Sequence, residues 1–490
     1  MKSSILCSAL TLPDRRHKNH RVRGGTMSSI AKIGLFVTAL LEDDYNKTGH
    51  MRPKMAEATN RIAGILAPYG EIVNPGFVEY EPDAERAAAL FNAEGVDLIV
   101  VIELAYQKGI IPMRALLRVT APILVWNTQQ IRRLPEDADF DLIMENSGMA
   151  GVPELTSALI RSGRSFELIT SHIADAAALE QIGQYARAAA AIRRLEKMRI
   201  GVIGHAFEGM TDLMIDQLSL RDVVGPVCWP IEPEKVAQRV ATMDATRVKA
   251  FMQEQAARHD ASEMPPDLFE LSAKLALALL DTARQEGFDA LATFDQVWLT
   301  DPRVGIIPSY GTGYLCSQGI PVATEADVTT LTAMMILQEL AGQATFLENY
   351  VIDFDNDAII LSHDGHGNPA LAADAKAVKI KPSIYYEGVN GRGAGLEFAY
   401  APGEVTLLSL IPLGDGSWRL IVAEGESLPM TPRPVAAPQM LFRYRDGNII
   451  EFCDRWLLAG APHHMALAYG RLAEQVVKLG SLLGVEVAHV

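Results

Sequence analysis

From residue 30 onward, short apolar runs alternate with amphipathic segments, and this alternation constrains the fold more than any other feature. Runs such as KIGLFVTALL (32–41) and VDLIVVIE (96–103) have the length and side chains of buried strands. The segment 52–70 between them keeps apolar residues at helical spacing and ends in glycine. A second series of this kind starts at RIGVIG (199–204). We therefore expect an α/β chain with two doubly wound parallel-sheet (Rossmann-like) domains.

After Asn349 the pattern changes, because strands separated by glycine, asparagine and proline replace the long helices. Residues 350–363 predict two strands around an Asp-Asn-Asp turn, and 404–426 predict a hairpin. A terminal helix is expected over 465–484, and FDLIME (140–145) in the first domain is expected to be a strand. The expected divisions are 1–29, a basic and disordered leader; 30–190, an N-terminal α/β domain; 191–350, a central α/β domain carrying Glu325 and Glu348; and 351–490, a mainly antiparallel β domain with a terminal helix, carrying His363 and His464.

The charge balance argues against two classes of partner. With 44 basic and 60 acidic side chains the net charge is -16, which repels nucleic acid and anionic lipid. The first 26 residues differ, with six basic residues against Asp14; we interpret them as a disordered tail before a start at Met27, rather than as an export signal. Four widely spaced cysteines and the lack of a long apolar run predict a cytoplasmic protein without a membrane partner.

Nucleotide and serine-hydrolase motifs are missing. The chain has no G-x-x-x-x-G-K-[ST], and GVIGHAFEG (201–209) lacks the G-x-G-x-x-G spacing that lets a backbone approach a pyrophosphate. No G-x-S-x-G sequence occurs either. We therefore expect no nucleotide cofactor.

Two glutamates are candidates for metal chemistry. Glu325 follows a strand-like run and precedes a helix, so its carboxylate belongs at the carboxyl end of a strand, where open α/β sheets place ligands. It could equally be a helix-start carboxylate favoured by the helix dipole. Glu348 lies among apolar and aromatic residues, so it is either solvated at a strand edge or bound to a cation.

Two pairs of histidines supply nitrogen donors. His363 and His366 lie on a glycine-containing loop, and His463 and His464 are adjacent. Any of these histidines alone could be a solvated loop residue, and at most one of an adjacent pair is expected to bind a metal. Two carboxylates and two imidazoles can together hold a divalent ion and leave positions open for substrate.

From residue 30 to the C-terminus the sequence resembles the L-arabinose isomerase and L-fucose isomerase superfamily. The segment 319–330 is similar to the family's Glu-x-Asp motif before a long helix, which aligns the ligand glutamate with Glu325. TFLENY (345–350) is similar to Phe-Met-Glu-Asp-Tyr and aligns the second glutamate with Glu348.

Two further motifs carry the same resemblance. IILSH, with a proline six residues later, selects His363 over His366. LLAGAPHHMAL (457–467) is similar to Leu-Ala-Gly-Gly-Ala-His-His and points to His464 rather than His463 as the ligand. The resemblance implies metal ligands Glu325, Glu348, His363 and His464.

The resemblance also implies an activity. It is that of an aldose-ketose isomerase for a pentose or 6-deoxyhexose, L-arabinose-like or L-fucose-like, using Mn2+ or another divalent cation such as Co2+ or Mg2+ and a cis-enediol intermediate. Glu325 is then the base and Glu348 the partner acid, although the two roles could be exchanged. Family members are homo-oligomers, commonly trimers or hexamers. Epimerisation, isomerisation of a branched or modified sugar, and a non-catalytic sugar-binding protein remain alternatives.

Departures from the family pattern concern the sugar-recognition loops. TALLEDDYNKTG (38–49) replaces the family's Thr-Gly-Ser-Gln loop, and Asn-Thr-Gln (127–129) replaces His-Thr-Gln. The substrate contacts that we expect are Asn127, Gln129, Tyr45, His463 and Phe207, with His205 similarly placed. Phe207 could instead be an apolar anchor for its loop.

Overall fold

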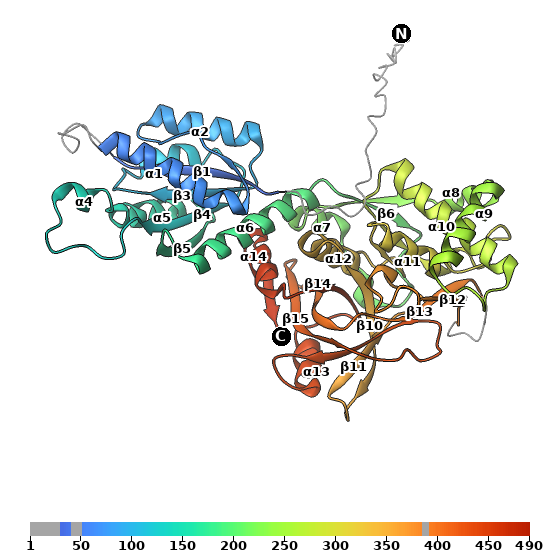
Figure 1. Cartoon of the computed structure of the whole chain (residues 1–490). Helices are drawn as coiled ribbons and strands as arrows, with labels where there is room; N and C mark the ends of the chain where they lie inside the picture. The colour runs from blue at the N-terminus through green and yellow to red at the C-terminus, as the bar shows by residue number, and fades with distance from the viewer. Residues whose placement is uncertain (1–29, 41–50, 385–391) are drawn as a thin grey trace, which may run out of the picture.

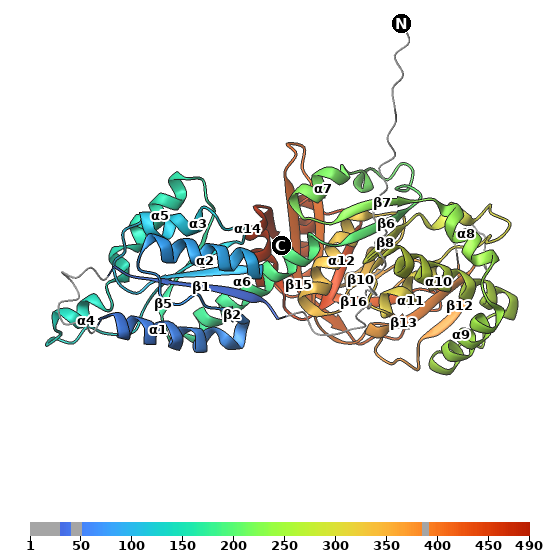
Figure 2. The same cartoon turned by 90° about the horizontal axis from the view of Figure 1, so that it is seen from above.

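A computed structural model describes residues 30–40, 51–384 and 392–490. Figures 1 and 2 both show the first sheet and its helices at one end of the molecule, and the remaining two sheets packed together at the other. The expected leader, 1–29, lies outside the described residues. No helix in the described ranges is long and apolar enough to span a membrane.

The first sheet is parallel, with strand order β2-β1-β3-β4-β5. Strand β3 is buried along its whole length, as a parallel strand covered on both faces must be. Its strands are β1 (Lys32–Thr38), β2 (Glu71–Val73), β3 (Leu98–Glu103), β4 (Ile123–Gln129) and β5 (Glu167–His172). Its helices are α1 (Met51–Leu66), α2 (Glu81–Glu94), α3 (Ile110–Leu116), α4 (Phe140–Met144), α5 (Val152–Arg161) and α6 (Ala176–Leu195).

The strand expected at 140–145 is wrong, because this segment forms the short helix α4. Asp139 caps it by accepting a hydrogen bond from the backbone N–H of Leu142 at 2.9 Å. None of the α4 side chains is buried, so its apolar residues have no sheet to pack into.

The second sheet is also parallel, with strand order β7-β6-β8-β9. Helix α10 begins with a proline in its first turn and ends at Gly287, whose φ of 71° is left-handed, as its sequence predicted. The strands are β6 (Arg199–Ile203), β7 (Val227–Ile231), β8 (Ala290–Thr293) and β9 (Val322–Ala323). The helices are α7 (Gln217–Val223), α8 (Pro233–Ala241), α9 (Ala245–Arg258), α10 (Pro266–Glu286), α11 (Ser309–Ser317) and α12 (Val328–Ala341).

The third sheet is mainly antiparallel, and the pairing of β15 with β16 closes part of it into a ring. Both expected hairpins are present, β10 with β11 and β14 with β15. Its strands are β10 (Thr345–Asp353), β11 (Ala358–Ser362), β12 (Lys379–Pro382), β13 (Ala394–Ala399), β14 (Gly403–Pro412), β15 (Trp418–Leu428), β16 (Pro438–Tyr444), β17 (His464–Tyr469) and β18 (Glu486–His489); α13 (Ile449–Leu458) and α14 (Ala473–Leu483) are its helices. The predicted fold class is confirmed.

The terminal helix is shorter than expected. Residues 464–469 form strand β17 between β10 and β14, and α14 starts only at Ala473. Their apolar side chains satisfy a strand buried on both faces as well as a helix, and the sheet neighbours decide between the two. As a result, His464 belongs to a buried strand and not to the mouth of a helix.

The second and third sheets share one apolar core. Val322 on β9, Leu331 on α12, Leu408 on β14 and Ala466 on β17 belong to the same buried cluster. Loops at the ends of β9, β10, β11 and β17 therefore have fixed positions relative to one another.

Candidate metal centre

Glu325 lies in a strained turn between β9 and α12. Both Glu325 and Ala326 have positive φ, 57° and 53°, a conformation that costs a residue with a side chain about 1–3 kcal/mol. Two backbone hydrogen bonds hold the turn: the Phe207 N–H donates to the Glu325 carbonyl at 3.1 Å, and the Ala326 N–H donates to the Thr293 carbonyl at 3.0 Å. The turn places the Glu325 carboxylate at the seam between the second and third sheets.

Asp327 caps α12 and also orients His464. Its Oδ1 accepts hydrogen bonds from the Thr330 N–H at 2.8 Å and the Thr329 hydroxyl at 2.7 Å. Its Oδ2 is 3.0 Å from His464 Nδ1. Burial opposes the ionisation of Asp327, but these bonds outweigh it and lower its pKa. The ionised Asp327 therefore keeps the proton on Nδ1 of His464 and leaves Nε2 free to bind a metal.

His464 and Glu348 face each other across two paired strands. In the ladder of β10 and β17, Glu348 is opposite His464, and in the ladder of β10 and β11 it is opposite Ser362, the residue before His363. The ring of Phe346 packs against both imidazoles, with centroid distances of 4.9 Å to His363 and 4.5 Å to His464. Three neighbouring strands thus hold these side chains in place.

Glu325, His363 and His464 form a cluster whose ligand atoms all lie within 4.8 Å of one another. Glu325 Oε2 is 3.5 Å from His464 Nε2, and Glu325 Oε1 is 3.9 Å from His363 Nε2. Burial lowers the pKa of His363 well below its usual range, so its imidazole is neutral, the form that binds metals. Glu348 lies beside this group of three and is not part of it.

Buried polar atoms without hydrogen-bond partners indicate what the cluster is suited to bind. Glu325 Oε2, His363 Nδ1 and His464 Nε2 are buried and have no hydrogen-bond partner. Buried polar atoms almost always have a partner, and a carboxylate with two imidazoles is a donor set for a divalent transition metal. The residues therefore fit a divalent cation.

Further carboxylates surround the cluster. Burial, with the nearby charge of Glu325, raises the pKa of Asp295 and of Asp364 to about 7 in each case. Burial also raises the pKa of Glu348, although His464 and His463 oppose the shift. So many carboxylates in one buried region favour a cation between them.

His463 points to a different partner from His464. Its Nδ1 is 2.5 Å from Asp212 Oδ2, and its Nε2 is 3.8 Å from Glu325 Oε2. Burial opposes its charge, but contacts with Glu325 and Asp212 outweigh that effect and raise the pKa of His463 to about 9. At neutral pH His463 is therefore a cation beside the cluster.

His366, the alternative to His363, faces helix α11. Its Nδ1 is 2.7 Å from the Thr312 hydroxyl, and the residue is fully buried. It thus ties the loop after His363 to α11 and is outside the group of three.

The other expected substrate contacts divide between two places. Phe207 lies beside the turn of Glu325, and its ring packs edge-on against Phe294 at 5.5 Å; His205 also stacks on Phe294, at 4.6 Å. Asn127 and Gln129 are instead on β4 of the first sheet, where Asn127 donates to the Thr170 hydroxyl and Gln129 to the Ile131 carbonyl. Figure 1 shows β4 well away from β10, and Figure 2 shows the neighbouring strand β5 of the same sheet equally far from it. Tyr45 lies outside the described residues.

Three supporting residues went unrecognised in the sequence: Asp212, Asp327 and Phe346. The Glu-x-Asp spacing did contain a signal for Asp327, because an aspartate directly before an apolar helix is a typical N-cap. Nothing in the sequence pairs Asp212 with a histidine 251 residues away.

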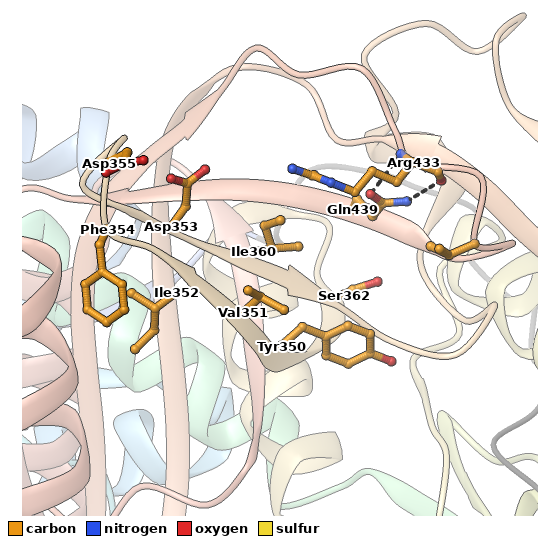
Figure 3. A pocket seen from close by; sticks show the side chains of 11 residues that line it. Tyr350, Val351, Ile352, Asp353, Phe354, Asp355, Ile360, Ser362, Arg433 and Gln439 are labelled. Carbon is orange, nitrogen blue, oxygen red and sulfur yellow. Dashed lines mark hydrogen bonds between the residues drawn. The ribbon is translucent and has the colours of Figure 1, made fainter.

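A hollow of about 540 Å³ lies on the same hairpin but is not lined by the cluster. Figure 3 shows Phe354 and Ile352 at one end of it and the hydrogen-bonded pair Arg433 and Gln439 at the other. Its wall exposes Val351 and Phe354, so it is mainly an apolar surface.

Comparison with known proteins shows one consistent likeness. Residues 343–486 match the family model described as the L-arabinose isomerase C-terminal domain. Proteins named L-arabinose isomerase align over most of the chain: one from a Nocardioides species is 26% identical over 472 residues, covering 89% of this chain and 90% of the relative. One from Yersinia pseudotuberculosis is 24% identical and one from Erwinia tasmaniensis 25%, each covering about three quarters of both chains.

Proposed function

We propose that this chain, which is similar to proteins named L-arabinose isomerase, is a divalent-metal-dependent aldose-ketose isomerase for a pentose or 6-deoxyhexose. The observation that carries the proposal is the cluster of Glu325, His363 and His464, in which Glu325 Oε2 and His464 Nε2 are buried without a hydrogen-bond partner. The relatives named L-arabinose isomerase support the reaction class.

Glu325, His363 and His464 would hold the metal, with Glu348 as a fourth ligand beside them. A divalent ion such as Mn2+, when bound, supplies a Lewis acid that stabilises negative charge on neighbouring substrate oxygens. Asp327 keeps His464 in the tautomer that such an ion requires.

The two glutamates would carry the protons. In our proposal Glu325 takes the proton from the carbon next to the carbonyl, and the same carboxylate returns it to the adjacent carbon after a cis-enediol forms. Glu348 exchanges the hydroxyl protons; its raised pKa keeps it closer to the working pH than an ordinary glutamate.

His463 would bind substrate as a cation. Asp212 holds its Nδ1, so its Nε2–H is directed toward the side of the cluster where Glu325 lies. A charged donor at that position favours a negatively charged oxygen of the enediol over the neutral carbonyl.

We further propose a homo-oligomer in which the first sheet of one copy completes the site of another. Within one chain, Asn127 and Gln129 lie on β4, apart from the cluster, and their hydrogen-bond partners among the described residues are Met149, Thr170 and Ile131, all near the first sheet. Polar side chains at the carboxyl end of a parallel strand are suited to bind a ligand. In the proposed oligomer, that ligand is the sugar bound at the metal centre of a neighbouring copy.

The test combines a substrate panel with two substitutions. Pentoses and 6-deoxyhexoses are incubated with Mn2+, and ketose formation and any epimeric aldose are measured. We expect ketose from at least one aldose, reversible loss of turnover with a chelator, and a fall in kcat of about 10²–10⁴-fold in Glu348→Gln. Glu339→Gln, which removes the partner of Arg194 away from the cluster, is the control and should keep kcat.

Two outcomes would contradict the proposal. Turnover that persists in both chelator and Glu348→Gln would exclude this metal site. An epimeric aldose as the only product would replace isomerisation by epimerisation on the same site.

A further inference from the structure

A cavity of about 350 Å³ lies at the end of the molecule remote from the first sheet. Its walls come from the C-terminal end of α9, one face of α11 and the segment that follows His363. Its volume is at the small end of the range of about 300–1,000 Å³ that is typical of small-molecule sites. The polar residues of its lining include Gln255, His259, Tyr310, Tyr314, Ser317 and Gln318.

Two buried polar groups in this lining have no hydrogen-bond partner. The Tyr310 hydroxyl and the Gln255 Nε2 are both unpaired, in side chains that are only 2% and 3% exposed. Buried polar groups in folded proteins are nearly always paired. Because Tyr310 and Gln255 both line the cavity, their unpaired polar groups indicate a ligand that can form hydrogen bonds with them.

The surroundings restrict the chemistry of that ligand. The Gln255 amide donates, the Tyr310 hydroxyl donates or accepts, and the rings of Tyr310 and Tyr314 offer apolar faces. Two cationic side chains also line the cavity: Arg258, which is paired with Glu254 at 2.8 Å, and Lys376. No carboxylate lines the cavity, which argues against a cation.

We propose that this cavity is a binding site for a small neutral polyhydroxylated molecule, a polyol or an aldose. Hydroxyl oxygens of such a molecule accept from Gln255 and exchange hydrogen bonds with Tyr310, and its C–H faces pack on the two tyrosine rings. The site is separate from the candidate metal centre, because none of Glu325, His363 and His464 lines it. The proposal does not depend on the isomerase activity.

A physical link nevertheless joins the two places. Pro369 and Ala370 of the cavity wall follow His363 in the chain, and Thr312 on α11 bonds His366 between them. Tyr310 and Thr312 are on the same helix, so α11 connects the cavity to the loop that follows His363.

Xylitol is the probe, titrated into the chelator-treated full-length protein by calorimetry. Removing metal prevents sugar binding through the metal centre. We expect saturable binding at one site per chain, weakened about three- to tenfold in Tyr310→Phe and in Gln255→Leu, each of which removes one hydrogen bond. Tyr185→Phe is the matched control: its hydroxyl bonds Glu167 beside the first sheet, so xylitol affinity should not change.

Three results would overturn the proposal. Lack of saturable binding would mean that the cavity holds only water, and equal affinity in all variants would place xylitol elsewhere. Tighter binding of glucose 6-phosphate than of xylitol would replace the neutral ligand by an anionic one. Because Tyr310→Phe and Gln255→Leu lie on different helices, misfolding of one leaves the other as a test, and turnover of the metal-loaded wild type is scored separately.

Discussion

At the scale of single residues, Asp327 connects helix capping with metal binding. One carboxylate oxygen caps α12 and the other faces His464 Nδ1. Asparagine caps a helix as well as aspartate does, but it presents an NH2 group where Asp327 presents its second oxygen. The two functions can therefore be separated by one substitution.

We predict that Asp327→Asn lowers Mn2+ affinity about 10–100-fold and changes the unfolding midpoint little. The new NH2 group opposes a proton on His464 Nδ1, and the tautomer with Nε2–H cannot bind the metal through that nitrogen. Equilibrium dialysis with Mn2+ and urea unfolding measure the two effects. Asp175→Asn, at the N-cap of α6, is the control and should change neither; unchanged Mn2+ affinity in Asp327→Asn would refute the role of Asp327.

Glu103 is a second buried carboxylate, at the carboxyl end of β3. Burial raises the pKa of Glu103 from 4.5 to about 8; the backbone N–H of Gln107 opposes this shift and the charge of Glu154 adds to it. The folded state therefore keeps a proton that the unfolded state releases. The stability that this proton provides is complete below pH 4.5 and is lost as pH rises through about 8.

We predict that Glu103→Gln removes this pH dependence, which amounts to about 5 kcal/mol over that range. The difference between the urea midpoints at pH 5 and pH 8.5 should be smaller in the variant than in the wild type. Glu79→Gln is the contrast: Glu79 is buried but paired with Arg52 at 2.7 Å, so its loss should lower the midpoint at both pH values. Parallel pH profiles for wild type and Glu103→Gln would show that Glu103 is not protonated in the fold.

The sequence identifies some residues of the site and misses others. Glu325, Glu348, His363 and His464 can be predicted because each lies in a short motif whose neighbours are adjacent in the chain, and the structure brings Glu325, His363 and His464 together. Asp212 and the positions of Asn127 and Gln129 depend on how separate sheets pack, which no local pattern encodes. Local signals thus identify candidate ligands, and packing decides what surrounds them.

At the scale of elements, the same limit appears in two segments. The runs at 140–145 and 464–469 are both apolar and short, and each satisfies the pattern of a helix or a strand. Asp139 caps segment 140–145 as a helix, whereas segment 464–469 forms a strand because it pairs with β10 and β14. Longer segments such as α10, with a proline start and a glycine end, carry enough signals to be predicted.

Helix α11 packs so closely on the loop after His363 that it has no room for a side chain at Gly313. A Cβ there would lie 2.5 Å from the Gly367 carbonyl oxygen and 2.6 Å from a Leu396 methyl group. We predict that Gly313→Ala destabilises the protein by about 1–3 kcal/mol and weakens Mn2+ binding by displacing the loop. Urea unfolding and equilibrium dialysis measure both.

Gly64 in helix α1 is the matched control, because a Cβ there meets nothing within 4 Å. Gly64→Ala should be neutral or stabilising by about 0.5–1 kcal/mol. If both alanine variants unfolded at the same urea concentration, the close packing of α11 would not be a determinant of stability.

At the scale of the whole molecule, the candidate metal centre joins two sheets. Glu325 comes from the second sheet, and His363 and His464 come from the third, all around one shared core. The first sheet has its own apolar clusters on its two faces. A metal bound at the seam should therefore stabilise the second and third sheets together and leave the first sheet unaffected.

We predict that Mn2+ at about 100 times its Kd stabilises this two-sheet unit by about 2.7 kcal/mol, a rise in its unfolding midpoint of about 4 °C. Hydrogen exchange resolves where the effect acts: amides of β10 and β17 should gain protection with Mn2+, while those of β3 and β4 should not. Glu325→Gln removes the ligand contributed by the second sheet and should abolish the shift, whereas Glu154→Gln, beside the first sheet, should retain it. Equal protection of all three sheets would mean that the molecule unfolds as one unit, and protection confined to β17 would place the metal outside the seam.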